Sequence, residues 1–297
     1  MFLSDLLKNQ VVLITGGGSG LGLELAKKFV SLGAEVHICG RRQVVIDEAI
    51  AQLETIPGAR AVGHIVDIRS ADAVQELVEK LWKESPLTAL VNNAAANFIS
   101  PTERISARGF DAIANTVFHG TFYMTNAVGQ KWISTGKPGS ILSIVSTGVV
   151  NGAPFAVPST MAKSAICAMT RALSIEWASK GIRLNAIGPG LIPTPGAVAR
   201  LMPGTSADEL ERTNPMRRLG RVDELQNLAT FLLSDSCAWL TGQVVMLDGA
   251  HHLAHGSVYS PLLKLTEEEW TVVSSEIRAH DKADKQLRGE AIPVSTP

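Results

Sequence analysis

The chain has few cysteines, few tyrosines and no long apolar run, and each shortage excludes a class of protein. Its three cysteines, Cys39, Cys167 and Cys237, form neither a CxxC pair nor a Cys/His cluster, so neither a disulfide framework nor a metal site is predicted. No apolar run reaches the roughly 18 residues that a membrane helix needs, and the first ten residues lack the apolar stretch of a signal peptide. We therefore expect a reduced, intracellular location, the cytoplasm, and no membrane partner.

An excess of charge of either sign is also missing. The 27 Lys and Arg residues oppose 28 Asp and Glu, for a net charge of −1, and no segment forms a basic stripe, which argues against nucleic acid as a partner. Hydrophobic residues make up 45% of the 297 and charged residues 19%, which excludes wholesale disorder. The composition therefore predicts a soluble α/β domain of enzyme size, and it includes only two tyrosines, Tyr123 and Tyr259.

Short apolar runs rich in β-branched residues alternate with stretches of helical spacing. This alternation predicts a parallel sheet covered on both faces, as in a Rossmann-type, doubly wound α/β fold with a mostly parallel seven-stranded sheet. No repeat or linker interrupts the chain, so we expect a single domain over residues 1–297, with 251–297 as a C-terminal extension. The seven expected strands are Val11–Thr15, Glu35–Cys39, Ala61–Val66, Leu87–Val91, Ser140–Val145, Ile182–Ile187 and Gln243–Leu247.

Helical spacing occupies most of the sequence between these strands. The segment Phe110–Trp132 predicts two helices or one bent helix, and Leu191–Glu211, rich in Pro, Gly and Ala, predicts a loop with short helices that covers a site. An amphipathic helix is expected in the tail at Glu267–Ala279. The other expected helices are Leu21–Leu32, Gln43–Leu53, Ala71–Trp82, Met161–Ser179 and Val222–Leu233.

A glycine-rich turn, TGGGSGLG at residues 15–22, lies between the first strand and the first helix. Glycines permit positive φ angles and let the backbone approach a pyrophosphate at a helix N-terminus. In this strand-turn-helix context the spacing indicates dinucleotide binding rather than an ordinary turn. The residues predicted to bind the cofactor here are Gly16, Gly18, Ser19, Gly20, Leu21 and Gly22.

Two arginines after the second strand indicate which nicotinamide cofactor is used. An acid there would bind the ribose 2′-hydroxyl, whereas an arginine pairs with a 2′-phosphate. Arg41 and Arg42 follow the strand with no acid before Asp47, which favours NADPH over the alternative of two solvated arginines at a helix start. After the third strand, Asp67 and Ile68 can bond and pack against adenine; capping the next helix is a competing role for Asp67.

Motifs in this order resemble the short-chain dehydrogenase/reductase family over about residues 8 to 250. They are the glycine-rich turn, Asp67, Asn92-Asn93-Ala94-Ala95, Pro189-Gly190, Thr194, and Thr241-Gly242 followed by Asp248-Gly249. The resemblance implies cofactor contacts from Asn93, Pro189, Gly190, Ile192 and Thr194, with Lys163 on the nicotinamide ribose.

A narrower resemblance is to the mitochondrial-type 2,4-dienoyl-CoA reductases. It rests on NAAANFISP at 93–101, GLIPTPGA at 190–197 and LTEEEW at 265–270. It implies that Arg69 and Arg200 contact acyl-CoA and that Asn97 and Phe98 lie at the substrate, with Phe98 lining an acyl tunnel. Family members of this type usually form tetramers through helices near residues 103–133 and 160–178, so we expect a homotetramer.

The catalytic positions depart from the usual family pattern. Most members carry a tyrosine four residues before the lysine; here Ser146 and Lys163 match, but position 159 is serine, so the phenol of ketone and alcohol chemistry is absent. Ser-x-x-x-Lys is what the dienoyl-CoA reductase branch shows. That branch uses another tyrosine and an asparagine, and the matching positions are Gly148 and His119. His119 can donate a hydrogen bond to an enolate or can be a packing residue.

We therefore predict NADPH-dependent reduction of a 2,4-dienoyl-CoA in fatty acid β-oxidation, with Lys163, Ser159, Ser146 and His119 as catalytic residues. Within the same class, the alternatives are a trans-2-enoyl-CoA reductase, another short-chain oxidoreductase, or a ketone reductase with a rearranged acid. From another class, the alternative is a catalytically inactive NADP-binding or assembly module, because both phenol positions lack tyrosine.

Overall fold

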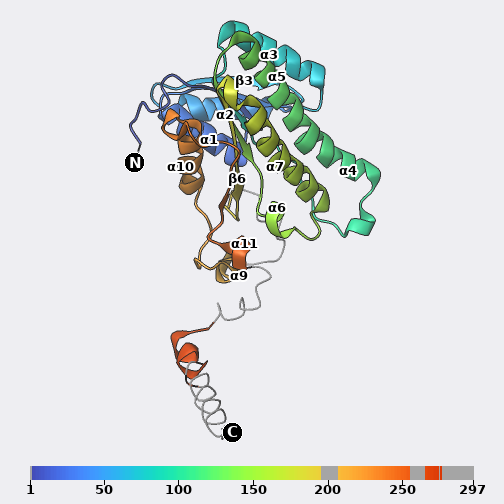
Figure 1. The fold of residues 1–297 in the computed structure, drawn as a ribbon, viewed down its shortest axis with the longest axis vertical. Helices are drawn as coiled ribbons and strands as arrows, with labels where there is room; N and C mark the ends of the chain where they lie inside the picture. Colours follow the sequence, from blue (N-terminus) through green and yellow to red (C-terminus); the bar gives the residue numbers. More distant parts are fainter. Residues whose placement is uncertain (1, 195–206, 255–264, 274, 276–297) are drawn as a thin grey trace, which may run out of the picture. The chain divides into compact units, whose positions relative to one another are not determined.

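The computed structural model describes residues 2–194, 207–254, 265–273 and 275. Contacts divide the chain into two compact units, Met1–His252 and Leu253–Pro297. The first unit holds the seven strands of the described residues, and Figure 1 shows helices packed around their sheet. In the second unit the described residues are helical at 267–273, which confirms the start of the expected tail helix at Glu267. Its expected end at Ala279 lies outside the described residues.

The first unit is built on one parallel sheet in the order β3-β2-β1-β4-β5-β6-β7. Every neighbouring pair is parallel, and the order reverses between β1 and β4. The doubly wound, seven-stranded fold that the sequence predicts is therefore confirmed. The strands are β1 Val11–Thr15, β2 Glu35–Gly40, β3 Arg60–Ile65, β4 Ala89–Asn92, β5 Gly139–Ile144, β6 Ile182–Pro189 and β7 Val244–Leu247.

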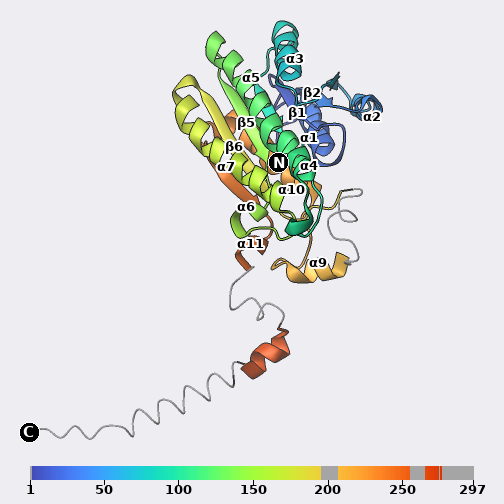
Figure 2. The same cartoon turned by 90° about the vertical axis from the view of Figure 1, so that its right-hand side faces the viewer.

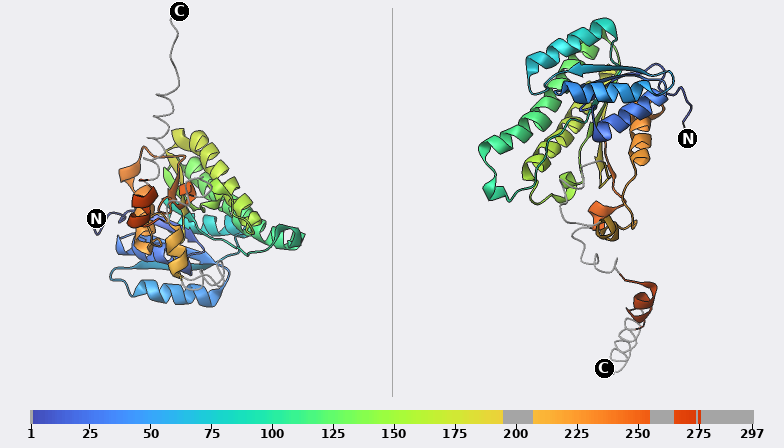
Figure 3. Two further views of the ribbon diagram at one scale, coloured as in Figure 1. Left: turned by 90° about the horizontal axis from the view of Figure 1, so that it is seen from below. Right: turned by 180° about the vertical axis from the view of Figure 1, so that it is seen from behind.

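Helices cover both faces of this sheet because its central strands are apolar on both sides. One core cluster joins the sheet to α1 (Gly20–Ser31), α2 (Gln43–Glu54) and α10 (Val222–Leu233). The opposite cluster joins it to α3 (Ala71–Glu84) and α5 (Gly120–Thr135), with Trp132 fully buried at its centre. Figures 1 and 3 show α10 on one side of the sheet and α3, α5 and α7 (Val157–Trp177) on the other.

The expected helix Phe110–Trp132 contains a feature that its hydrophobic spacing does not reveal. The chain forms α4 over Ala107–Ile113, continues as a π-helix over Ala114–His119, and becomes α5 at Gly120. A π-helix inserts residues into the helical repeat, and such segments frequently occur at functional sites. Of the two expected alternatives, two helices or one bent helix, the structure thus shows a single uninterrupted helical segment with a π-helical stretch in it.

Short helices surround the carboxyl end of the sheet. They include α6 (Gly148–Asn151) after β5, α9 (Ala207–Thr213) and α11 (His251–Ala254) after β7. Figure 2 shows α6 and the start of α11 at this same end of the strands. Of the expected covering loop Leu191–Glu211, residues 195–206 lie outside the described part. In an open parallel sheet, ligands bind at the carboxyl edge where the strand order reverses, which here is between β1 and β4.

Candidate active site

The glycine-rich loop between β1 and α1 packs directly on the segment that follows β4. Gly16 and Gly20 have φ angles of 66° and 56°, which favour glycine because side chains with a Cβ rarely adopt them. A Cβ on Gly16 would lie only 2.9 Å from the Cα of Ala94, whereas a Cβ on Gly20 would meet nothing within 4 Å. The loop therefore leaves open space in front of the N-terminus of α1, where backbone N–H groups can bind phosphate.

Hydrogen bonds between Thr15 and Asn93 hold this loop in place. The Oγ1 atom of Thr15 accepts hydrogen bonds of 3.0 Å from the backbone N–H groups of Asn93 and Ala94. In return, the amide of Asn93 donates to the carbonyl oxygens of Thr15 at 3.0 Å and Gly16 at 3.2 Å. The side chain of Asn93 thus fixes the loop.

A pocket of about 470 Å³ lies in front of this loop at the carboxyl edge of the sheet. It brings together residues from both halves of the chain, as the family resemblance implies. The sequence-predicted residues that line it are Gly16, Gly18, Ser19, Gly20, Leu21, Arg41, Asp67, Ile68, Asn93, Asn97, Ser146, Ser159, Lys163, Pro189 and Thr194.

The remaining predicted site residues do not line this pocket. Gly22 packs behind the loop, where a Cβ would lie 2.4 Å from the Nδ2 atom of Asn93. Ile192 lines a smaller cavity beside it, and Phe98 packs against the cluster that joins α4 to α7. Arg200 lies outside the described residues. The others that do not line the pocket are Gly190, Arg69 and His119.

The end of the pocket beside β2 and β3 carries two exposed arginines and one ion pair. Arg41 and Arg42 both line the pocket. The guanidinium of Arg69 donates to both carboxylate oxygens of Asp67 at 2.5 to 2.9 Å, which lowers the pKa of that carboxyl below its usual value. Asp67 does not cap α3, because the N-cap is Ser70, whose hydroxyl accepts from the N–H of Ala73. The competing capping role is therefore wrong.

Lys163 lies at the other end of the pocket, on α7. Its side chain is only 5% exposed, and its Nζ atom donates to the carbonyl oxygen of Ile144 at the end of β5. Burial lowers the pKa of Lys163 to about 8, because a low-dielectric surrounding disfavours the charged ammonium. Ser146 and Ser159 line the same pocket, so the three positions of the catalytic motif are brought together, with serine where most members carry tyrosine.

Among the described residues, no tyrosine lines this pocket. Gly148 opens α6, and a Cβ there would lie 3.0 Å from the Cβ of Ala153 and 3.5 Å from the Oγ of Ser146. His119 is exposed at the end of the π-helix, and its ring centroid lies 6.0 Å from that of Tyr123. The acid that completes a reduction is thus not a phenol of the described pocket.

Two pocket residues that the sequence left unassigned are Thr116 and Val66. Thr116 belongs to the π-helix, and its hydroxyl donates to the carbonyl oxygen of Ala112 at 3.0 Å. A regular α-helix, which hydrophobic spacing predicts here, would point the side chains of such a segment in other directions. Val66 directly follows β3 and precedes Asp67, so its place at the carboxyl end of a strand could have identified it as a pocket residue.

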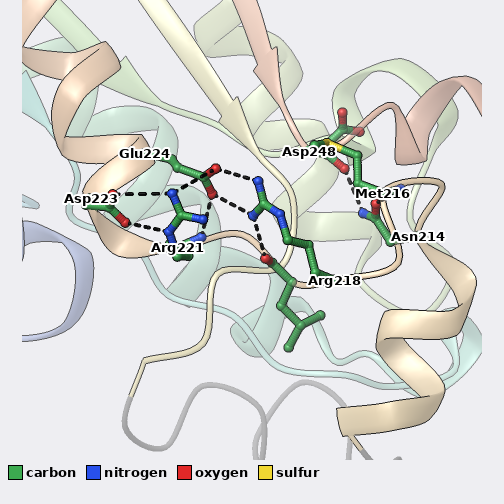
Figure 4. A network of polar contacts seen from close by, with 8 residues as sticks. Asn214, Met216, Arg218, Arg221, Asp223, Glu224 and Asp248 are labelled. Atoms are coloured by element: carbon green, nitrogen blue, oxygen red, sulfur yellow. Dashed lines mark hydrogen bonds and ion pairs between the residues drawn. The ribbon is translucent and has the colours of Figure 1, made fainter.

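A second, smaller cavity of about 120 Å³ lies beside the first. Figure 4 shows the polar network that borders it: Arg218 bonds both carboxylate oxygens of Glu224 at 2.6 and 2.9 Å, and Asn214 donates to the backbone carbonyl of Asp248 at 2.8 Å. Because of these bonds, the pKa of Glu224 falls to about 2. The network ties the segment after α9 to α10 and to the end of β7.

These features fit a dinucleotide. The open space before α1, the arginines at one end and the buried lysine at the other match its phosphates, adenosine and nicotinamide ribose in turn. In the described part of the chain no group of three or more His, Cys, Asp or Glu residues is arranged to hold a metal. Within that same part, no helix has the length and apolarity to cross a membrane.

Comparison with known proteins gives the same picture. Residues 16–252 match the family model described as enoyl-(acyl carrier protein) reductase. A probable 2,4-dienoyl-CoA reductase of Caenorhabditis elegans, (3E)-enoyl-CoA-producing, is 35% identical over 94% of this chain and 93% of that protein. A probable 2,4-dienoyl-CoA reductase of Bacillus subtilis, (2E)-enoyl-CoA-producing, is 36% identical over 83% of this chain and 98% of that protein.

Solved structures extend the comparison. A short chain dehydrogenase from Bacillus anthracis superposes with a TM-score of 0.76 at 36% identity, covering 84% of this chain and 99% of that one. A gluconate 5-dehydrogenase from Burkholderia cenocepacia, solved with NADP and tartrate, gives 0.77 at 27% identity, covering 84% and 97%. The fold, the pocket and these relatives make this chain an oxidoreductase of the kind that binds NAD(P) and acts on carbon–carbon double bonds. It belongs to the short-chain dehydrogenase/reductase family.

Proposed function

We propose that the protein reduces a 2,4-dienoyl-CoA with NADPH, as a step of fatty acid β-oxidation. The observation that carries this proposal is one pocket in which Lys163 and Ser146 lie beside Ser159, at the position where ketone reductases need a tyrosine. In reduction of a conjugated thioester the negative charge is spread over a dienolate, so the tyrosine that ketone reductases carry four residues before the lysine is not required. The names of the relatives from Caenorhabditis elegans and Bacillus subtilis support the same substrate class.

The choice of NADPH rests on Arg41 and Arg42. Both line the adenine end of the pocket, and a planar guanidinium matches the geometry of a 2′-phosphate. The nearest acid in that region, Asp67, is bonded to Arg69. The NADP in the Burkholderia cenocepacia structure belongs to a relative of the same fold and supports this choice.

When bound, NADPH supplies a hydride to the δ-carbon of the conjugated thioester. Lys163 holds the ribose hydroxyls and raises the local positive potential, and Ser159 helps to orient the cofactor. Ser146, with backbone N–H groups near it, donates hydrogen bonds to the thioester oxygen as negative charge gathers there. The exposed His119 assists this oxyanion in the same proposal. Asn97, Phe98, Arg69 and Arg200 are assigned to the acyl-CoA.

Purified protein with NADPH and 2,4-hexadienoyl-CoA tests the proposal directly. We expect oxidation of NADPH with formation of a single enoyl product, identified by NMR as the 3-enoyl or 2-enoyl thioester. An Arg41→Ala, Arg42→Ala double variant should lose most of the preference for NADPH over NADH, while Lys8→Ala, a change away from the pocket, should keep it. If 2,4-hexadienoyl-CoA stays unchanged at high enzyme concentration, the assignment fails.

One specific observation favours a second candidate. Because tyrosine is missing at both 148 and 159, the chain could serve as an NADP-binding or assembly module without turnover. Tight NADPH binding with no reaction on dienoyl, enoyl or keto thioesters would support it. Turnover of a trans-2-enoyl-CoA but of no dienoyl-CoA would instead identify the enoyl reductase. The proposed dienoyl-CoA reductase is also expected to be a homotetramer in the cytoplasm. Analytical sedimentation tests the oligomeric state, and cell fractionation tests the location.

A further inference from the structure

A histidine–aspartate pair follows β7, and the proposed reaction gives its side chains no role. The Oδ2 atom of Asp248 accepts a 2.7 Å hydrogen bond from the backbone N–H of His252 and lies 2.8 Å from Nδ1 of the same residue. The side chain of Asp248 is 2% exposed and that of His252 is 15% exposed. One carboxylate oxygen therefore holds both the backbone and the ring of the histidine.

Asp248 itself is held from the other side. The side chain of Asn214 donates to its backbone carbonyl at 2.8 Å, as Figure 4 shows. A Cβ on Gly190 would lie 2.7 Å from the Cβ of Asp248, so the carboxylate stands directly beside the Pro189-Gly190 turn. This packing leaves the aspartate little freedom, and the imidazole that it binds inherits a defined orientation.

The pair lies at the same edge of the sheet as the reactive end of the dinucleotide pocket. Gly188 pairs with Met246 across β6 and β7, and a Cβ on Gly188 would lie 3.4 Å from the carbonyl oxygen of Ser146. The segment 189–194 borders both cavities, because Pro189 and Thr194 line the larger one and Ile192 the smaller one. Ser146, after β5, and Asp248, after β7, therefore lie at the same edge of the sheet, on either side of the end of β6.

The reaction in the proposed function needs a proton that no described pocket residue clearly supplies. No tyrosine of the described part of the chain lines the pocket, and the ammonium of Lys163 donates to the carbonyl oxygen of Ile144. Imidazole is the side chain that most often transfers protons in enzymes. A carboxylate bound to one ring nitrogen fixes the ring and stabilises the imidazolium, while the other nitrogen performs the transfer. With Nδ1 on Asp248, the transferring atom is Nε2, which makes no hydrogen bond to any described residue.

We propose that His252, oriented by Asp248, is the general acid that protonates the dienolate; this inference rests on the proposed reduction of a dienoyl-CoA. The N–H bond at Nε2 breaks and a C–H bond forms on the dienolate. The hydrogen on Nδ1 stays on the ring and remains hydrogen-bonded to Asp248. The substrate thus gains one hydride and one proton, NADPH is oxidised to NADP⁺, and the neutral imidazole regains its proton from solvent. His252 replaces the phenol that both positions 148 and 159 lack.

The test compares His252→Gln with His251→Gln, a change of the preceding histidine on α11. With 2,4-hexadienoyl-CoA we expect His252→Gln to lower kcat about 100-fold, with the KM for NADPH within about twofold of wild type. His251→Gln should keep kcat within about twofold. Asp248→Asn, which removes the anionic acceptor, should lower kcat at least about tenfold. Added imidazole should restore about tenfold of the activity that His252→Ala loses.

A binding measurement gives a readout that does not depend on turnover. Carbethoxylation of His252 by diethyl pyrocarbonate, followed by mass spectrometry, should slow when NADP⁺ and 3-hexenoyl-CoA are added, while carbethoxylation of the preceding His251 serves as the internal reference. Wild-type turnover with an undiminished kcat in His252→Gln overturns this inference alone. A rate of His252 carbethoxylation that the ligands leave unchanged, or a His252→Ala variant that added imidazole does not rescue, also overturns it. Absence of wild-type turnover on any dienoyl-CoA overturns the proposed function and this inference together.

Discussion

The Nδ1 atom of His37 lies 2.9 Å from the Nε2 atom of His64, and the two buried imidazoles stack with an interplanar angle of 21°. They come from adjacent strands, β2 and β3, on the face of the sheet that also carries Cys39. The second ring nitrogen of His37 lies 3.1 Å from a carboxylate oxygen of Glu35. Two facing ring nitrogens share one hydrogen, so this arrangement does not accommodate protonation of both rings.

Acid should therefore destabilise the fold through His64. Burial, followed by the charges of His37 and Lys80, lowers the pKa of His64 to about 4, whereas in the unfolded chain it is near 6.5. The unfolded state then binds more protons between these values, so stability is complete above pH 6.5 and falls as the pH drops toward 4. We expect a loss of about 2 kcal/mol between pH 7 and 5, measured by urea unfolding.

Glu35 and Arg60 also face this pair, and the pKa of Glu35 is lowered, so its contribution is lost only at still lower pH. His64→Gln should lose less than half as much stability over the same interval. His119→Gln, a change of an exposed histidine, should keep the wild-type dependence. Equal pH dependence in wild type and His64→Gln would contradict this account.

Lys163→Met should stabilise the protein while it abolishes turnover. The ammonium is buried with one carbonyl as its hydrogen-bond partner, and burial lowers its pKa from 10.5 to about 8. Removal of this charge should raise the free energy of unfolding at pH 7 by about 1 to 3 kcal/mol. Wild-type stability should also rise between pH 8 and 10.5, where the unfolded lysine holds more protons, and Lys163→Met should lack this rise. Lys180→Met, at an exposed lysine, is the control.

Ser159→Tyr should give the pocket a ketone reductase activity. The substitution places a phenol four residues before Lys163, in a pocket that already contains Ser146. General acid catalysis contributes about 100-fold or more, so reduction of acetoacetyl-CoA should rise at least about tenfold over wild type. The double variant with Lys163→Met should lose this gain. A wild-type protein that reduces acetoacetyl-CoA as fast as Ser159→Tyr would refute the prediction.

Gly129→Ala tests the packing between α5 and α7. A Cβ at this position would lie 2.4 Å from the Cη2 atom of Trp177, a buried ring that cannot move without disturbing the core. We expect a net loss of about 2 kcal/mol, because overpacking outweighs the ~1 kcal/mol that alanine gains in a helix. Thermal unfolding measures this loss. As the control, a Cβ at Gly109 in α4 would make only ordinary contacts at 3.4 Å or more, so Gly109→Ala should be neutral or slightly stabilising in the same assay.

The course of the sheet could be predicted because each strand is a short apolar run bounded by turn residues. All seven expected strands occur, and α10 begins at Val222 and ends at Leu233 as expected. The local sequence pattern does not reveal secondary structure that is determined by tertiary contacts. The π-helix at Ala114–His119 and the four-residue helix α6 depend on packing around the pocket, and neither leaves a periodic pattern in the sequence.

The candidate site shows the same division. Residues fixed by a strand end or by the glycine-rich loop, such as Ser19 and Asp67, line the pocket as expected. His119, placed by matching a helix position at the end of the π-helix, does not line it, because one inserted residue turns a side chain by about 100° around the helix axis. The pairing of Asp248 with His252 could not be predicted, since it depends on how the chain leaves β7.

The ion pair between Asp67 and Arg69 carries a consequence for the order of binding. The same carboxylate that holds Arg69 is the one proposed to receive the adenine amino group, and Arg69 is assigned to acyl-CoA. Adenine that engages Asp67 weakens its hold on the guanidinium and frees Arg69 for an incoming phosphate. The cofactor would then enter first and the thioester second, so that steady-state kinetics would follow a compulsory sequence rather than a random one.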